Sequence, residues 1–306
     1  MKLPIKLTLP NSFLAAEIRQ GYEISTKLKK IWAIELDLLN ELMEVCKKHD
    51  IKFQVFAGTL LGAVRHRGFI PWDDDVDVAL TRVEYNKLLS VSDEFKAPYF
   101  LQTALSDQRY FCPYARLRNS ETSAIIGDQH DPAYNGGIYI DIFVLDGCSQ
   151  YGILFKFQHM LRIIVRKFLT VYYQKEPRNS SFRERLLHLV RIPARMLPYS
   201  AWYAAYLKVI TMFEKSPILA FLSHTTWNKS RHWLYRKEAE ELSELPFETL
   251  KVPVSKYAHE ILSRNYRDYM SFPPVELRGK WHEGVIHFEP DIPYKEYLSK
   301  IANDAK

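Results

Sequence analysis

The chain has 306 residues, of which 47% are hydrophobic, and a formal net charge of +6. This composition allows a sizeable core and excludes wholesale disorder, and the length suits one large domain or two ordinary ones. The three cysteines lie far apart without a CxxC pair, which indicates neither a disulfide framework nor a zinc finger and favours a reducing compartment. We expect neither a signal peptide nor a membrane span, because no apolar run reaches the ~18 residues that a span needs.

Local patterns predict alternating helices and strands up to about residue 150. Apolar residues at helical spacing predict a helix over 22–49, and alternation with period two predicts a strand over 75–80. Further helices are expected over 59–66 and 82–95, and further strands over 53–56, 99–103, 114–118, 123–126 and 137–145. The last of these strands, GIYIDIFVL, is nearly all apolar, so we predict that it lies centrally in a sheet.

The chain changes character after residue 150. Residues 151–237 hold 16 Lys and Arg against three acids, a net +13, which leaves −7 for the rest of a chain of net +6. Long helices punctuated by prolines are predicted here. We expect three parts: a core over 1–150, a basic amphipathic helical region over 151–250, and a C-terminal return over 251–306 that packs on the core. The charge asymmetry favours an anionic partner, either nucleic acid or a membrane surface.

Four aspartates crowd the segment PWDDDVDVAL, residues 71–80. Asp75 and Asp77 are two residues apart in a predicted strand, so their side chains project from one face. Adjacent carboxylates repel each other unless a cation lies between them, and Mg²⁺ takes oxygen ligands beside substrate phosphates. Asp141, the lone charge in the apolar central strand, becomes a third ligand if the two strands are neighbours. The alternative is a solvated turn at Asp73–Asp75 and an Asp141 that pairs with an arginine.

Gly58 and Thr59 lie where a predicted strand ends and a helix begins. Small residues there let backbone N–H groups approach a phosphate at the helix N-terminus. The full pattern consists of Gly-Thr, a spacer of about fifteen residues, Asp-x-Asp on a strand and a distant Asp on another strand. It is more specific than any one of these parts.

This pattern resembles the signature of the nucleotidyltransferase superfamily. More closely, FAGTLLGAVRHRGFIPWDDDVDVAL resembles the diagnostic block of the LicD family, which includes bacterial phosphocholine transferases and the animal fukutin-related proteins. YARLRNSETSAII and GGIYIDIFVLDG also resemble LicD blocks, and YRDYMSFPP weakly resembles the late motif. The resemblance covers residues 22–147 but not 151–237. Together with the helices predicted after residue 150, the resemblance implies an α/β (α+β) fold: a nucleotidyltransferase-like mixed sheet with flanking helices, plus a basic helical region.

The resemblance implies a metal-dependent transferase. LicD enzymes are understood to move a phospho-alcohol from a CDP carrier to a sugar hydroxyl, with release of CMP. We expect phosphocholine from CDP-choline, Mg²⁺ (or Mn²⁺) as the cofactor, and a cell-surface glycan or lipid-linked sugar as the acceptor, as in lipopolysaccharide, teichoic acid or capsule. Positioning and charge neutralisation do most of the work in phosphoryl transfer.

Carried over residue by residue, the resemblance implies that the metal ligands are Asp75, Asp77 and Asp141. It also makes Asp141 the candidate that draws the proton from the acceptor hydroxyl. Gly58 and Thr59 are the residues implied to hold phosphate oxygens.

Three arginines are candidates for holding the diphosphate. Arg65 is six residues along the helix from Thr59 and could reach the edge of the acidic cluster. Arg116 and Arg118 share one face of a predicted strand. The alternative for Arg118 is a structural ion pair. Trp72 is either a core residue or a surface for a quaternary ammonium group, held by cation–π contact.

Residues 153–172 place apolar side chains on one side of a predicted helix. Arg162, Arg166 and Lys167 lie on the other side or at its flanks. This composition is typical of an interfacial helix that meets anionic lipid, and the alternative is a core helix with a solvated basic face. No HTH, RRM or KH signature supports nucleic acid. We therefore expect a cytoplasmic protein, peripheral on the inner face of the cell membrane, with no nucleic-acid partner.

Two other functions stay open. A nucleotidyltransferase would use the same core on an NTP and release pyrophosphate, but PWDDDVD together with GTLLGAVRH favours LicD. A non-catalytic module would bind lipid-linked glycan through its basic helices, but three intact candidate metal ligands argue against it.

Overall fold

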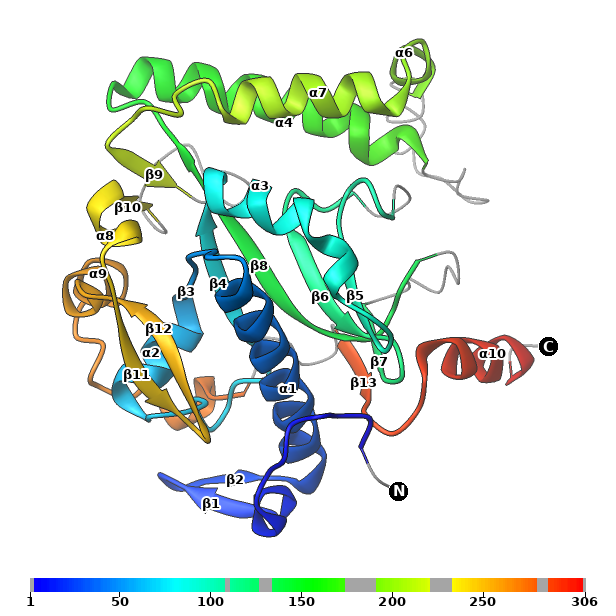
Figure 1. Ribbon diagram of the computed structural model, residues 1–306, viewed down its shortest axis with the longest axis vertical. Coiled ribbons are helices and arrows are strands. Elements are labelled where there is room, and N and C mark those ends of the chain that lie inside the picture. The colour runs from blue at the N-terminus through cyan, green and yellow to red at the C-terminus, as the bar shows by residue number, and fades with distance from the viewer. Residues whose placement is uncertain are drawn as a thin grey trace. The chain divides into compact units, whose positions relative to one another are not determined.

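The computed structural model describes residues 3–107, 111–126, 134–173, 191–220, 233–279 and 286–304 (Figure 1). The chain forms two compact units: unit 1 comprises Met1–Gln102, Tyr114–Phe143 and Glu238–Lys306, and unit 2 comprises Thr103–Pro113 and Val144–Lys237. Residues 238–250, predicted to belong to the basic helical region, lie in unit 1. Residues 103–113, predicted to belong to the core, lie in unit 2.

Unit 1 is built on a mixed sheet. Its strands lie in the order β5 (Tyr99–Gln102), β6 (Ala115–Asn119), β8 (Ile138–Gly147), β4 (Asp77–Thr81) and β3 (Gln54–Val55). The pairs β5–β6, β6–β8 and β3–β4 are antiparallel. Strand β8 has strands on both sides and buries most of its side chains, which confirms its predicted central place. The predicted α/β class, with a mixed sheet and flanking helices, is confirmed.

Helix α1 (Thr26–Lys48) lies against β6 of this sheet (Figure 1). The Ser25 hydroxyl caps its first turn, because it accepts a hydrogen bond from the Leu28 N–H at 3.2 Å. Helices α2 (Ala57–Arg65) and α3 (Arg82–Ser90) precede and follow β4 in the chain, and both contact it. The predicted helix–strand–helix succession around the aspartates is therefore present.

A short hairpin replaces the first residues of the predicted helix 22–49. Tyr22–Ile24 form strand β2, which pairs with β1 (Glu17–Arg19). Gln20 and Gly21 in the turn both have positive φ, 52° and 74°. Two successive positive φ values are what a tight two-residue hairpin loop requires, and they end any helical pattern that precedes α1.

The C-terminal part of unit 1 supports the core with elements that the sequence did not predict individually, and β11 (Leu242–Phe247) lies in the region predicted to be helical. These elements are β11, β12 (Leu250–Ser255), α9 (Ala258–Tyr266), the 3₁₀ turn Val275–Leu277, β13 (Ile286–Glu289) and α10 (Tyr294–Asp304). The β11–β12 hairpin contacts α2 and β3, and β13 pairs with β7 (Ser123–Ile126). This part of the chain therefore packs directly on the helix that carries Gly58 and Thr59.

Unit 2 consists of helices and a small strand group. Helix α4 (Gly152–Tyr172) packs beside α7 (Tyr199–Ile210), and the short α6 (Arg191–Arg195) contacts α4 (Figure 1). Strand β9 (Ile218–Ala220) pairs with β10 (Trp233–Tyr235) and with the last residues of β8. Helix α8 (Arg236–Glu240) follows β10. The prediction of long helices after residue 150 is confirmed for the described residues.

Helix α4 buries a different side from the one that the sequence predicts. Its first half buries Gln158, His159 and Arg162, whereas Ile153 and Phe157 are exposed by 80% and 48%. Arg162, predicted to lie on the basic side of the helix or at its flanks and to face anionic lipid, is 4% exposed and therefore does not belong to an exposed basic face. The physical reason is that α7 covers this side of the helix: the Gln158 side chain donates to the Val209 carbonyl oxygen at 3.0 Å.

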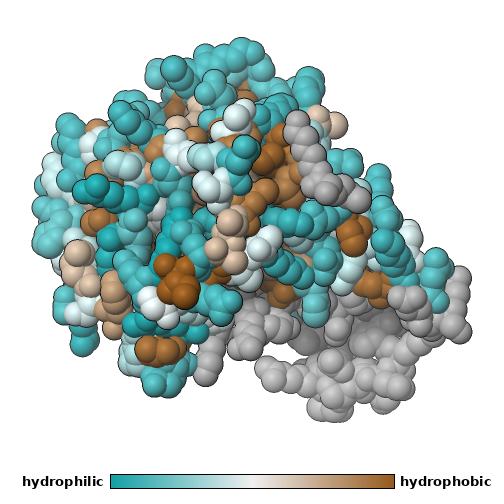
Figure 2. Space-filling view, turned by 90° about the horizontal axis from the view of Figure 1, so that it is seen from below, coloured by the Kyte–Doolittle hydropathy of each residue, from teal (hydrophilic) through white to brown (hydrophobic). Residues whose placement is uncertain are grey.

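Hydrophilic residues predominate on the described part of the face drawn in Figure 2, and hydrophobic residues form small groups there. Among the described residues, no helix combines the length and the apolar character that a membrane crossing needs.

Candidate active site

Helix α1 holds the start of the aspartate segment in place. Trp32 Nε1 donates to the Asp73 carbonyl oxygen at 2.9 Å, and the Asp73 N–H donates to the Ile70 carbonyl at the same distance. The Trp32 ring is fully buried and stacks on Phe69, with 4.6 Å between ring centroids. The backbone at Asp73 is therefore tied to the core before the chain enters β4.

Asp77 is the first residue of β4 and Asp141 lies in β8, whereas Asp75 precedes β4, so the strand predicted over 75–80 begins two residues later than expected. Strand β8 lies next to β4, and the Asp141 N–H donates to the Val76 carbonyl oxygen at 2.9 Å. Burial raises the pKa of the Asp77 carboxyl well above its usual value, and the charges of Asp75, Asp141 and Asp73 raise it further. This shift has the direction that neighbouring carboxylates produce.

The donor chemistry of this group fits the predicted cation, because Mg²⁺ and Mn²⁺ take carboxylate oxygens. Within the described ranges, however, no three Asp, Glu, His or Cys side chains are placed to hold a metal ion. Arg116 Nε instead donates to Asp141 Oδ1 at 2.6 Å, and the register pairs these residues directly across β6 and β8. Asp141 thus has the arginine partner of the alternative interpretation, and metal ligation by Asp75, Asp77 and Asp141 stays a prediction.

Glu35 of α1 is a further acid near this group, and the sequence analysis missed it. The side chain is 1% exposed, and its Oε2 atom has no hydrogen-bond partner in the described part of the chain. Burial raises its pKa well above the usual value, and the charges of Asp75, Asp74 and Asp73 raise it further. A sequence signal existed, because Glu35 is four residues after Ile31 on the apolar stripe of the helix.

Gly58 and Thr59 lie in the first turn of α2, and both have partners in the aspartate segment. A Cβ atom at Gly58 would lie 2.9 Å from Asp73 Oδ2, so glycine here allows a carboxylate to approach the start of the helix. The Thr59 hydroxyl accepts a hydrogen bond from the Asp77 N–H at 2.8 Å. Its own proton can still be donated to another group, so the phosphate role of both residues stays a prediction.

Arg118 is fully buried. Its Nε donates to Gln102 Oε1, and its Nη1 donates to the Gly137 carbonyl oxygen, each at 2.6 Å. Its guanidinium also lies 4.5 Å from the centroid of the Tyr139 ring. These contacts favour a structural role over the predicted contact with a diphosphate.

Arg65, at the C-terminal end of α2, points toward the late motif YRDYMSFPP. Its Nη1 donates to the carbonyl oxygens of Tyr269 at 2.7 Å and Ser271 at 3.0 Å, and its Nε donates to His66 Nε2 at 2.8 Å. Two segments that are about 200 residues apart in the sequence therefore meet at this arginine.

Trp72 is a core residue, 7% exposed. The Cζ atom of Arg278 lies 4.6 Å from the centroid of its ring, and the rings of Tyr22 and His66 meet it edge-on. A guanidinium group therefore occupies the cation–π position that a quaternary ammonium group would need.

Comparison with known proteins identifies a domain that contains some of these residues. Residues 50–125 match the family described as "LicD/FKTN/FKRP, nucleotidyltransferase domain". Over these residues the chain is similar to the LicD family. The LicD domain includes the first block of the sequence from Gly58 to Asp77 and the arginines of β6, so the predicted resemblance is confirmed.

Proteins similar to this chain are found in bacteria. The lipopolysaccharide cholinephosphotransferase LicD of Haemophilus influenzae is 26% identical over 263 residues, which cover 81% of this chain and 92% of that protein. An uncharacterized protein of Rickettsia prowazekii is 39% identical over 84 residues, 27% of this chain and 30% of that protein. An uncharacterized protein of Rickettsia typhi is 39% identical over 59 residues, 19% of each chain.

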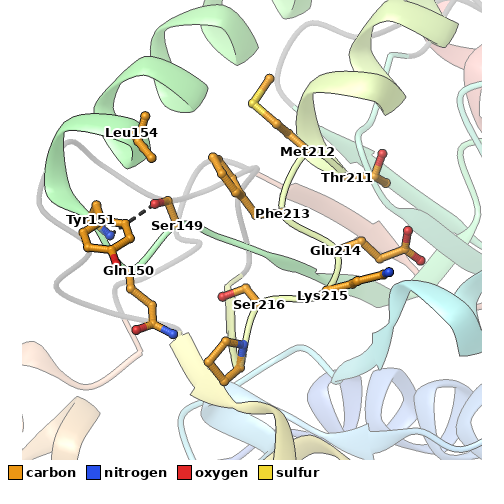
Figure 3. Close-up of a pocket in the computed structure, with 11 residues that line it drawn as sticks. Ser149, Gln150, Tyr151, Leu154, Thr211, Met212, Phe213, Glu214, Lys215 and Ser216 are labelled. Atoms are coloured by element: carbon orange, nitrogen blue, oxygen red, sulfur yellow. Dashed lines mark hydrogen bonds between the residues drawn. The ribbon is translucent and has the colours of Figure 1, made fainter.

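A cavity in unit 2 lies outside the LicD domain. It has a volume of about 580 Å³ and is lined by residues 149–151, Leu154 and residues 211–217 (Figure 3). Ser149 Oγ accepts a hydrogen bond from the Tyr151 N–H at 3.1 Å (Figure 3). None of the predicted site residues lines this cavity, so it adds nothing to the candidate active site.

Proposed function

We propose that this transferase moves a phospho-alcohol, phosphocholine first, from a CDP-activated donor to a hydroxyl group of a cell-surface or lipid-linked glycan. The observation that carries the proposal is the hydrogen bond from the Asp141 N–H to the carbonyl oxygen of Val76, which lies between Asp75 and Asp77 in a segment that matches the LicD domain. The similarity to the lipopolysaccharide cholinephosphotransferase, which extends over 92% of that protein, supports the choice of donor group and acceptor.

The proposed reaction is an in-line phosphoryl transfer. A bond forms between the acceptor oxygen and the phosphorus of phosphocholine, the bond from that phosphorus to the CMP oxygen breaks, and the acceptor proton passes to a carboxylate. Asp141 is the candidate for this proton. The Arg116 guanidinium, 2.6 Å from Asp141 and 4.0 Å from the centroid of the Tyr139 ring, orients the carboxylate.

Other residues of the chain position the donor in this proposal. The Thr59 hydroxyl can donate to a phosphate oxygen while it accepts from the Asp77 N–H. A Mg²⁺ or Mn²⁺ ion, when held by Asp75, Asp77 and Asp141, would supply neutralisation of the diphosphate charge. Arg65 does not share this position with Thr59, because it lies at the opposite end of α2.

The test is the leaving group. The purified protein is incubated with a sugar acceptor and a panel of CDP-alcohols that includes CDP-choline, and CMP release is measured with and without a chelator. The proposal expects CMP with at least one CDP-alcohol. Pyrophosphate from an NTP, without CMP from any CDP-alcohol, would support the nucleotidyltransferase alternative instead.

We also propose that unit 2 attaches the protein to an anionic membrane surface on the cytoplasmic side. Two observations support this location. Residues 151–237 carry 16 basic residues against three acids, and one side of α4 exposes large apolar side chains, among them Ile153, Phe157 and Met160. Basic charge beside exposed apolar surface is typical of interfacial helices.

A further inference from the structure

Two arginines of unit 1 share an aromatic surface that is distinct from the aspartate cluster. The Cζ atoms of Arg65 and Arg278 lie 5.1 Å and 5.7 Å from the centroid of the Phe272 ring. Arg278 also lies over Trp72 at 4.6 Å. The rings of His66 and Phe272 stack with 5.8 Å between centroids, so the cations and rings form one cluster.

The two guanidinium groups have neutral partners only. Arg65 donates to backbone carbonyl oxygens and to the His66 ring, and Arg278 Nε donates to the Pro273 carbonyl oxygen at 3.1 Å. In the part of the chain that the structure describes, neither forms an ion pair with a carboxylate. Arg19, by contrast, pairs with Glu248 at 2.5 Å.

The local electrostatics agree with an excess of positive charge. Burial lowers the pKa of Arg65, and the charge of Arg278 lowers it further. Burial lowers the pKa of His66 to about 4, and the charges of Arg65 and Arg19 contribute. Burial is the larger cause of each shift, and the neighbouring cations act in the same direction.

We propose that Arg65 and Arg278 form a binding site for a phosphate group. The guanidinium fork matches the oxygens of a phosphate, and stacking on an aromatic ring fixes the plane of the fork before the ligand arrives. Each arginine keeps terminal N–H groups that no protein acceptor within the described ranges takes. The His66 ring, which accepts from Arg65 Nε and stacks on Phe272, adds a further polar group to the cluster.

This phosphate site adds a binding step to the proposed function, and the identity of its ligand rests on that function. The phosphate belongs either to the diphosphate of the donor or to a phosphorylated sugar of the acceptor. The trimethylammonium group of choline does not fit here, because Arg278 covers the ring of Trp72 and both arginines would repel a cation.

The test compares Arg278→Gln with the unchanged protein in calorimetric titrations with CDP, CMP and cytidine. The exposed Arg267→Gln, in the same C-terminal segment, is the matched control for loss of one positive charge. If the site holds the donor, Arg278→Gln weakens CDP binding at least ~10-fold and leaves cytidine binding unchanged, because a charge-assisted contact to phosphate is lost. Arg278→Lys, which keeps the charge without the fork, recovers part of the affinity.

The second arm addresses the acceptor. If the site holds an acceptor phosphate, Arg278→Gln leaves CDP binding unchanged and raises KM at least ~10-fold for a phosphorylated glycan but not for the same glycan after phosphatase treatment. The inference is overturned if Arg278→Gln changes neither quantity more than Arg267→Gln does, or if it lowers only the Tm. Binding of CDP that depends on Arg278, without any transfer, would contradict the proposed function and leave the phosphate site intact.

Discussion

At the scale of single residues, the three aspartates carry the first prediction. Asp75→Asn, Asp77→Asn and Asp141→Asn should each lower turnover at least ~100-fold, because a metal-held diphosphate loses several kcal/mol of charge stabilisation. CMP release from CDP-choline measures the effect. Asp93→Asn, at an exposed position of unit 1, is the matched control and should keep normal turnover. Near-normal rates with Asp141→Asn would remove Asp141 from the mechanism.

Glu35 gives a prediction about pH and stability. Its carboxyl has a raised pKa in the folded protein, so the folded state binds this proton more tightly than the unfolded state does. The associated stability is complete below the unfolded pKa of about 4.3 and is lost as pH rises through the folded pKa. Glu35→Gln cannot ionise, so its advantage in free energy of unfolding over the unchanged protein should widen from pH 5 to pH 9.

Urea unfolding at pH 5, 7 and 9, with a chelator present, measures this difference. Glu35→Ala is a useful comparison, because it removes the ionisation and also leaves a cavity in the core. A difference between the Gln variant and the unchanged protein that stays constant with pH would show that Glu35 titrates normally in the folded state.

The sequence predicts some site residues better than others, for physical reasons. Alternation within a strand is local, so the sequence predicts that Asp75 and Asp77 share one face, but β4 begins only at Asp77 and the shared face stays a prediction. The roles of Arg116 and Arg118 depend on the register of β6 against β8, which places Asp141 opposite one and Tyr139 opposite the other. No local pattern contains that register.

At the scale of elements, helix α2 gives the third prediction. A Cβ atom at Gly62 would lie 2.5 Å from the Gly68 carbonyl oxygen, a backbone atom that cannot move aside alone. Gly62→Ala should therefore lower the free energy of unfolding by roughly 1–3 kcal/mol, the usual cost of overpacking. Gly152→Ala is the matched control, because nothing lies within 4 Å of its Cβ position. Equal stability of both variants, measured by urea unfolding, would contradict the close packing of α2 on this turn.

Elements with a strong apolar period could be predicted, and elements set by distant partners could not. Helix α1 and strand β8 are evident in the sequence because their own side chains define a buried face. The strands β11 and β13 carry weak patterns and are stabilised by β12 and β7. Arg278 follows a short 3₁₀ turn, Val275–Leu277, so its position beside Arg65 depends on the path of the whole C-terminal segment.

Helix α4 has the predicted helical period, but the period did not predict correctly which of its side chains are buried. A helical wheel separates the apolar residues of α4 from its basic residues, but it does not predict which side of α4 packs against α7. Packing against α7 buries Gln158 and Arg162 and leaves Ile153 and Phe157 exposed. Arg162 is therefore unsuitable for testing lipid contact, because its replacement would disturb the helix pair itself.

At the scale of the whole molecule, the exposed side of α4 gives the last prediction. The protein should bind vesicles that contain anionic lipid and bind neutral vesicles much less, because each basic residue near an anionic surface contributes about 1 kcal/mol. Phe157→Ser should weaken binding by at least ~10-fold through loss of apolar burial, and Lys156→Glu should reduce the part that salt screens. Ile18→Ser, at an apolar position of unit 1 that is 75% exposed, is the control and should bind as the unchanged protein does. Vesicle co-sedimentation at low and high salt measures all four proteins, and equal binding to neutral and anionic vesicles would contradict attachment through this surface.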